Sequence, residues 1–182
     1  MKTYLPGIIV IEPEVHSDPR GHFLEMYHEK RYHEMGMTTA FVQDNLSHSI
    51  KGVLRGLHYQ LNHPQGKLVS VIKGTIFDVA VDIRFRSPTF GQWMGIELSA
   101  ENQKQLYIPP DFAHGFYVLS EEAIFHYKCT DYYYPQDEYG ILWNDKEMNI
   151  QWPNIKNPLL SSKDQQFPLL NTIPPNNLPL GK

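Results

Sequence analysis

Proline and glycine interrupt the apolar runs of this chain at short intervals. The 182 residues include 14 Pro and 12 Gly, and the apolar runs between them, such as 68–72 and 76–82, have the length of single strands. Short apolar runs separated by turn residues are typical of antiparallel proteins with many tightly connected strands. We therefore expect an all-β fold in which Lys73-Gly74 forms a hairpin turn, with residues 29–37 as the best candidate for one of a few short helices.

Length, charge and cysteine content narrow the class of protein further. At 182 residues the chain fits one domain, 1–182, in which residues 171–182 form an irregular Pro-rich tail. The net charge of −4 gives no basic field, so neither nucleic acid nor a membrane is an expected partner. Cys129 is the only cysteine, which rules out an intrachain disulfide. Because no long apolar run occurs and residues 1–6 do not resemble a leader, we expect a cytoplasmic protein.

The stretch 53–74 places three basic side chains, Arg55, His58 and Lys67, on or between two short apolar strands. A pair of strands gains no stability from such side chains, so we expect an anionic or proton-active ligand beside them. Strict alternation puts Arg55 on the strand face opposite to His58. Gly56 lies between them and can host a bulge that brings both side chains to one face.

Two other polar clusters are candidates for ligand binding. Arg20 belongs to a turn, and Phe23 and Glu25 share one face of the strand that follows. A guanidinium for phosphate, an aromatic ring and a carboxylate suit a nucleotide, although an ordinary edge strand with an exposed salt bridge explains them equally well. The run Gln43-Asp44-Asn45 interrupts an extended segment, which makes it a candidate pocket wall or, by default, a turn.

Two half-motifs resemble those of the cupins. His58-x-Gln60, Lys67 and Gly74 have the layout of the first cupin motif, and Pro109-x-Asp111-x-x-His114 has that of the second. The resemblance implies an antiparallel double-sheet jelly roll. Gln60 and Lys67 stand where the usual motif has metal-binding His and Glu, and an ammonium group repels a divalent ion. We therefore expect no metal, but a cavity that stabilises an anion formed in the substrate.

These residue types suit the removal of a proton from a carbon next to a ketone. A histidine supplies a base with a near-neutral pKa, and Lys67 supplies a positive charge for the enolate oxygen. Inverting the carbon then requires an acid on the opposite face, for which a tyrosine hydroxyl is a suitable donor. Asp164 is a candidate carboxylate to support the histidine, although spacing alone favours an ordinary surface carboxylate.

A more specific resemblance runs from about residue 7 to residue 164. The chain resembles the dTDP-4-dehydrorhamnose 3,5-epimerase family in Asp18-x-Arg20-Gly21-x-Phe23-x-Glu25, Gln43-Asp44-Asn45, Val53-Leu54-Arg55-Gly56-Leu57-His58, Gln65-Gly66-Lys67, Phe77-Asp78-Val79-x-Val81-Asp82, Ser87-Pro88-Thr89-Phe90-Gly91, Ala113-His114-Gly115-Phe116 and Leu160-Ser161-x-Lys163-Asp164. The resemblance implies an isomerase of jelly-roll subunits that needs no cofactor and works as a homodimer. Its implied substrate is a dTDP-linked 4-keto-6-deoxyglucose on the route to dTDP-L-rhamnose.

The resemblance also implies roles for individual residues. His58 is the implied base with Asp164 as its partner, and Tyr127 is the implied proton donor, with Tyr133 as an alternative donor or substrate contact. Lys67, the catalytic cation suggested by its residue type, is an implied substrate contact as well. The other implied substrate-binding residues are Arg20, Phe23, Glu25, Gln43, Asp44, Asn45, Arg55, His114, Glu138 and Lys163. Of these, Arg20, Phe23 and Glu25 are expected to reach the site of the partner subunit.

Three alternatives stay open at this level. Relatives in the same family invert only one carbon or act on a different nucleotide sugar. A metal-dependent cupin oxygenase and a non-catalytic sugar-binding cupin are rivals of a different class, and Lys67 argues against the oxygenase.

Overall fold

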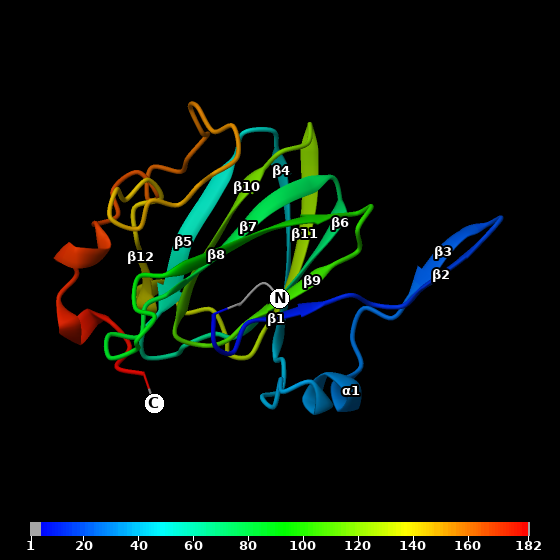
Figure 1. Cartoon of the computed structure of the whole chain (residues 1–182), viewed down its shortest axis with the longest axis horizontal. Coiled ribbons are helices and arrows are strands. Elements are labelled where there is room, and N and C mark those ends of the chain that lie inside the picture. Colours follow the sequence, from blue (N-terminus) through cyan, green and yellow to red (C-terminus); the bar gives the residue numbers. More distant parts are fainter. Residues whose placement is uncertain (1–4, 182) are drawn as a thin grey trace.

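The computed structural model describes residues 5–181, which form two five-stranded antiparallel sheets packed face to face (Figure 1). The first, here called the β4 sheet, has the order β1 (Ile9–Ile11), β9 (Gln105–Ile108), β6 (Lys67–Lys73), β11 (Glu122–Cys129) and β4 (Gln43–Ile50). The second, the β5 sheet, has the order β12 (Glu138–Gly140), β5 (Leu54–Gln60), β10 (Phe112–Val118), β7 (Thr75–Asp82) and β8 (Trp93–Ser99). The predicted antiparallel double-sheet fold is therefore confirmed.

Outside the two sheets, a hairpin of β2 (Val15–Asp18) and β3 (Gly21–Leu24) projects away from the body of the molecule (Figure 1). The α-helix α1 (Glu29–Glu34) follows it. Three single-turn 3-10 helices, η1 (Pro135–Asp137), η2 (Leu170–Thr172) and η3 (Pro175–Asn177), lie in the last third of the chain. No helix among the described residues is long and apolar enough to cross a membrane.

The main core fills the space between the sheets. Val69 and Phe125 of the β4 sheet pack in one cluster with Ile76, Phe116 and Val118 of the β5 sheet, and all five are nearly inaccessible to solvent. Alternation along each strand directs these side chains inward. The same alternation leaves the other inward positions at one end of the sandwich for polar side chains, and the cavity described below lies there.

The C-terminal segment covers the outer face of the β5 sheet. Ile173 and Leu178 are buried in a second cluster with Leu57 and Val81, and the Tyr59 hydroxyl donates to the carbonyl of Asn177 over 2.8 Å. Burial of this apolar face explains why a Pro-rich segment without long helices or strands follows a defined path. Lys182, the last residue of the expected tail 171–182, lies outside the described residues.

The predicted hairpin at Lys73-Gly74 is wrong. β6 pairs with β9 and β11, and β7 pairs with β8 and β10, so the turn at Gly74 carries the chain from one sheet to the other. A Cβ on Gly74 would lie 2.0 Å from the carbonyl oxygen of Glu122, so only glycine fits this crossing. β5 and β6 likewise lie in different sheets, so the basic residues of 53–74 approach the cavity from opposite sides.

The expected bulge at Gly56 is confirmed. Between His58 and Arg55, β5 uses three residue steps where its partner β10 uses two, from His114 to Phe116. The extra residue reverses the alternation, so Arg55 and His58 both line the cavity while Leu57 packs in the core. Gly56 has φ of +108°, and a Cβ there would lie 2.5 Å from the carbonyl oxygen of His114.

Two elements are shorter than the sequence predicts. The helix ends at Glu34 because Met35 caps it and Gly36 has φ of +103°, a conformation that ends helices. The strand predicted to follow the turn at Arg20 and to include Glu25 ends at Leu24, where the pairing with β2 ends. Glu25 therefore lies beyond the strand.

Candidate active site

A cavity of about 520 Å³ lies between the two sheets and contains most of the predicted site residues. The β4 sheet contributes Gln43, Asn45, Lys67 and Tyr127. The other predicted residues that line the cavity come from strands of the β5 sheet or from segments outside the strands. They are Arg55, His58, His114 and Glu138 on strands, and Tyr133, Lys163 and Asp164 outside them. Residues more than 100 positions apart thus meet in one concave site, which is the usual setting for a ligand.

His58 lies between two carboxylates. Its Nε2 is 2.6 Å from Oδ1 of Asp164, and its Nδ1 is 3.4 Å from Oε1 of Glu138. Asp164 is only 3% exposed, and the Ser161 hydroxyl accepts a hydrogen bond from its backbone N–H. Burial acts to raise the pKa of Asp164, but the hydrogen bond and charge of His58 outweigh burial, so the pKa lies below its ordinary value. Asp164 is therefore an anion that orients the imidazole of His58.

Glu138 connects three of the predicted residues. One of its oxygens pairs with the Lys163 ammonium and accepts a hydrogen bond from the Tyr133 hydroxyl over 2.8 Å, while the other faces His58. Burial acts to raise the pKa of Glu138, but Lys163, His58 and Tyr133 together lower it below its ordinary value. This carboxylate therefore stays ionised and ties one wall of the cavity together.

Two tyrosine hydroxyls lie in the cavity and both hold their protons firmly. Burial raises the pKa of Tyr127 to about 12, and the charge of Arg55 offsets part of that shift. Burial and the hydrogen bond to Glu138 raise the pKa of Tyr133 to about 12. A hydroxyl with such a pKa stays neutral near pH 7 and gives up its proton only to a strong base.

Lys67 provides a partly buried cation in the wall of the cavity. Burial lowers its pKa, and the carboxylates of Glu138 and Asp78 oppose that shift through their charges. Those two carboxylates form ion pairs elsewhere, Glu138 with Lys163 and Asp78 with His114. The Lys67 ammonium is thus placed to interact with an anion of a ligand.

His114 belongs to a second His–Asp pair, of which the sequence predicted the histidine but not its aspartate partner. His114 Nε2 lies 2.9 Å from Oδ2 of Asp78, and Asp78 is completely buried. β10 and β7 are neighbours in the sheet, and Phe116 of β10 lies opposite Asp78 of β7. His114 stands two residues before Phe116 on the same face, so its imidazole reaches the carboxylate of Asp78. Asp78 stood in a recognised motif, but only the strand register reveals that it holds His114.

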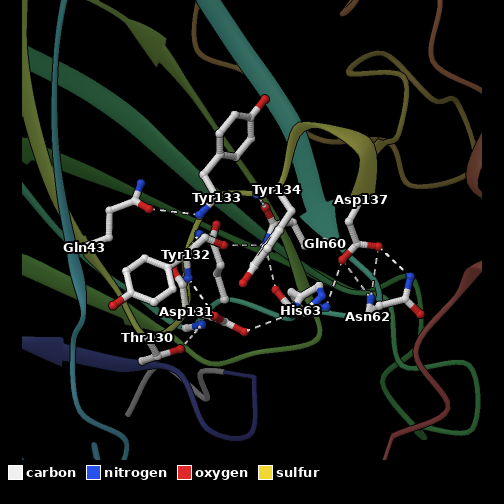
Figure 2. Close-up of polar contacts among 12 residues, drawn as sticks. Gln43, Gln60, Asn62, His63, Thr130, Asp131, Tyr132, Tyr133, Tyr134 and Asp137 are labelled. Carbon is white, nitrogen blue, oxygen red and sulfur yellow. Dashed lines mark hydrogen bonds and ion pairs between the residues drawn. The ribbon is translucent and has the colours of Figure 1, made fainter.

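Two glutamines hold the segment that carries Tyr133 (Figure 2). The side-chain oxygen of Gln43 accepts from the backbone N–H of Tyr133 over 2.9 Å, and that of Gln60 accepts from the backbone N–H of Tyr134 over 2.8 Å. The Gln60 amide donates in turn to the carbonyl of Tyr132 over 3.1 Å. Gln60, which stands at a metal-ligand position of the cupin motif, therefore has a structural role in this chain.

Four predicted site residues lie outside the cavity. Arg20 pairs with Asp18 on the projecting hairpin, and Glu25 pairs with Arg31 of α1. Phe23 is 71% exposed. Asp44 lies on the outward face of β4, where it pairs with Lys128 over 2.7 Å, because its neighbours Gln43 and Asn45 take the inward positions.

The side chains that could bind a metal do not gather in the described part of the chain. Within residues 5–181 no group of three or more His, Cys, Asp or Glu side chains is arranged to hold a metal ion. His58 and His114 each have an aspartate partner, and Lys67 lies in the same cavity.

The His58–Asp164 pair leads to a prediction about acid stability. Because folding lowers the pKa of Asp164, the pair adds stability at every pH above the ordinary value of 3.8, and this contribution is lost as the pH falls below that value. The unfolding free energy of the wild type should therefore exceed that of Asp164→Asn by an amount that shrinks between about pH 5 and about pH 2. Urea unfolding at a series of pH values measures the difference, and a difference independent of pH would contradict the assigned pairing.

Comparison with known proteins agrees with this geometry. The family model described as dTDP-4-dehydrorhamnose 3,5-epimerase matches residues 2–172. A Shigella flexneri protein of that name is 57% identical over 166 residues, which cover 90% of this chain and 91% of that protein. A Streptomyces niveus protein named dTDP-4-dehydrorhamnose 3-epimerase is 40% identical over 91% of this chain and 81% of its own length.

A solved structure gives the same result. The crystal structure of a dTDP-6-deoxy-D-glucose-3,5-epimerase from Legionella pneumophila, in complex with dTDP-4-keto-L-rhamnose, superposes with a TM-score of 0.96 at 54% identity, covering 99% of this chain and 96% of that one. Sequence and fold thus agree over nearly the whole chain. The chain belongs to the dTDP-4-dehydrorhamnose 3,5-epimerase family.

Proposed function

We propose that this enzyme inverts C3 and C5 of dTDP-4-dehydro-6-deoxy-D-glucose and so forms dTDP-4-dehydro-L-rhamnose. The observation that carries the proposal is the meeting of three groups in one cavity: a carboxylate-supported imidazole, the ammonium of Lys67 and a tyrosine with a raised pKa. Proton removal next to a ketone needs a base, a stabiliser of the enolate oxygen and an acid, and these groups supply all three.

The reaction begins at His58. Asp164 holds the proton on Nε2, so the lone pair of Nδ1 takes the proton from the carbon next to the 4-ketone. The electron pair of the broken C–H bond moves into the ring, and the negative charge appears on the 4-oxygen, where Lys67 stabilises it. The imidazolium formed on His58 is in turn stabilised by the anion of Asp164.

Reprotonation from the opposite face completes each inversion. Tyr127 gives its hydroxyl proton to the carbon, since an enolate is basic enough to accept a proton from a group with a pKa of about 12. Solvent then takes the proton from His58 and restores that of Tyr127, so no oxidant or reductant is consumed. Tyr133, bound to Glu138, serves as a substrate contact, although its own pKa of about 12 would allow the same donation.

The products distinguish inversion of two carbons from inversion of one. The relative from Streptomyces niveus that is named a 3-epimerase makes a single inversion the second candidate. The enzyme would be incubated with dTDP-4-dehydro-6-deoxy-D-glucose, and the product would be reduced so that it carries no further epimerisable position. Proton NMR of the reduced product should show the L-rhamno configuration. A product inverted at one carbon only would establish the second candidate, and unchanged substrate would contradict both.

We also propose that two subunits form a dimer in which the β2–β3 hairpin of each completes the cavity of the other. Arg20 and Phe23 are exposed on that hairpin, which stands away from its own subunit (Figure 1). The outward face of the β4 sheet exposes apolar side chains that suit a partner surface, among them Leu46, Ile50 and Ile72.

Mixed dimers provide the test of this exchange. Arg20→Ala and His58→Asn should each be nearly inactive alone. After denaturation and refolding together in equal amounts, half of the dimers carry one of each subunit, and the subunit with Arg20→Ala has an intact base and receives an intact hairpin. Roughly a quarter of the wild-type specific activity should return. No recovery would show that Arg20 acts within its own subunit.

A further inference from the structure

The inward face of β4 is a ladder of polar side chains along the cavity. Gln43, Asn45, Ser47 and Ser49 point inward, and the residues between them point to solvent. Three of the four have partners among the described residues. Gln43 donates to Asn45 over 2.9 Å, the Asn45 amide lies 3.6 Å from the sulfur of Cys129, and Ser49 accepts from Arg55.

Ser47 is the exception in this ladder. Ser47 is one of the residues that line the cavity, and its Oγ is buried in the cavity wall, yet no described residue forms a hydrogen bond with it. Phe125 lies opposite Ser47 on the neighbouring strand and offers no polar group. A buried hydroxyl without a partner destabilises the folded protein, so its place in the cavity wall favours a role in ligand binding.

The next rung of the ladder shows which part of a ligand lies near Ser47. Arg55 Nε donates to the Ser49 hydroxyl over 3.1 Å, and Ser49 is only 4% exposed. This bond fixes the guanidinium beside β4 while its Nη groups have no acceptor in the described part of the chain. Ser47 and Ser49 are two residues apart on one strand face, about 7 Å between Cα atoms, so the Ser47 hydroxyl and the Arg55 guanidinium face the same part of the cavity.

We propose that Ser47 donates a hydrogen bond to an oxygen of the diphosphate group that Arg55 binds, and that Ser49 positions Arg55 for this contact. A guanidinium and a hydroxyl on adjacent rungs give a phosphate oxygen two donors of different kinds. The proposal rests on the proposed function only in taking the ligand to be a nucleoside diphosphate linked to a sugar. It assigns to Ser47 an effect on binding and none on proton transfer.

The test compares dTDP with thymidine by isothermal titration calorimetry. Ser47→Ala should weaken dTDP binding about tenfold, because a charge-assisted hydrogen bond is lost, while thymidine binding stays within about twofold. With the dTDP-sugar the KM should rise by a similar factor and kcat should change little. Equal dTDP affinity in wild type and Ser47→Ala would overturn the proposal, as would an equal loss for thymidine.

A matched control separates binding from folding. Ser47→Ala removes a buried group without a protein partner, so its melting temperature should equal or exceed that of the wild type. Ser99 lies outside the cavity, and its buried hydroxyl accepts a hydrogen bond from the backbone N–H of Asn102 over 3.0 Å. Ser99→Ala should therefore have a lower melting temperature than the wild type and an unchanged affinity for dTDP. A lower melting temperature for Ser47→Ala would show a structural role and contradict the proposal. Absence of turnover by the wild type would refute the proposed function, whereas the dTDP titrations would still decide the role of Ser47.

Discussion

His58→Asn should reduce kcat by about 10³-fold while the affinity for dTDP stays close to that of the wild type. The side chain lies 2.6 Å from the anion of Asp164 and faces the cavity, and asparagine keeps a polar group there but cannot take up a proton at neutral pH. The nucleotide is bound by other residues in this account, so its affinity should not depend on the base. Steady-state kinetics with the dTDP-sugar and calorimetry with dTDP measure the two quantities separately.

A matched histidine provides the control for this substitution. His33 is exposed on α1, outside the cavity, and His33→Asn should leave kcat unchanged. Retained turnover by His58→Asn would remove the assigned base. If dTDP affinity fell as much as kcat, His58 would support the fold or hold the ligand instead of acting as the base alone.

Lys67→Met should lower kcat by about 10²–10³-fold and leave the folded state equally or more stable. The side chain is partly buried in the cavity wall, and this loss of contact with water lowers the pKa of Lys67 despite the carboxylates around it. The neighbouring carboxylates pair with Lys163 and His114, so removing the ammonium breaks no ion pair among residues 5–181. Loss of activity without loss of stability is the expected property of a group placed for the transition state.

Kinetics and thermal unfolding of Lys67→Met test both parts of this expectation. Lys156→Met changes an exposed lysine outside the cavity and should alter neither quantity. A clear fall in melting temperature for Lys67→Met alone would mean that Lys67 stabilises the fold. Unchanged kcat would mean that another group holds the negative oxygen.

Much of the fold could be predicted from local sequence, but the pairing of strands could not. Short apolar runs and turn residues gave the positions of most strands, since both signals are local. The Lys73-Gly74 turn looks like a hairpin but crosses between sheets, because glycine at a tight turn does not reveal which strands will pair. The path of the C-terminal segment was likewise hidden, because Ile173 and Leu178 are isolated apolar residues without periodicity.

For the cavity, too, local sequence predicted some features and only the folded chain shows the others. Gly56 gave a physical reason to expect Arg55 and His58 on one face, and the register of β5 confirms it. Spacing alone did not favour Asp164 as the partner of His58, because 106 positions separate them and only the folded chain brings them together. The pairing of Asp78 with His114 depends on the register of β7 against β10, which the sequence does not reveal. The importance of Ser47 depends on which buried hydroxyls lack partners, which only the folded structure shows.

Proton exchange with solvent tests the central chemistry most directly. The wild type and His58→Asn would be incubated with dTDP-4-dehydro-6-deoxy-D-glucose in deuterated water, and the C3 and C5 signals followed by NMR. If His58 removes the protons beside the ketone and Lys67 holds the ketone oxygen, the wild type should incorporate deuterium at both carbons. His58→Asn should incorporate it at neither. Turnover without deuterium incorporation, or equal incorporation by both proteins, would contradict these two roles.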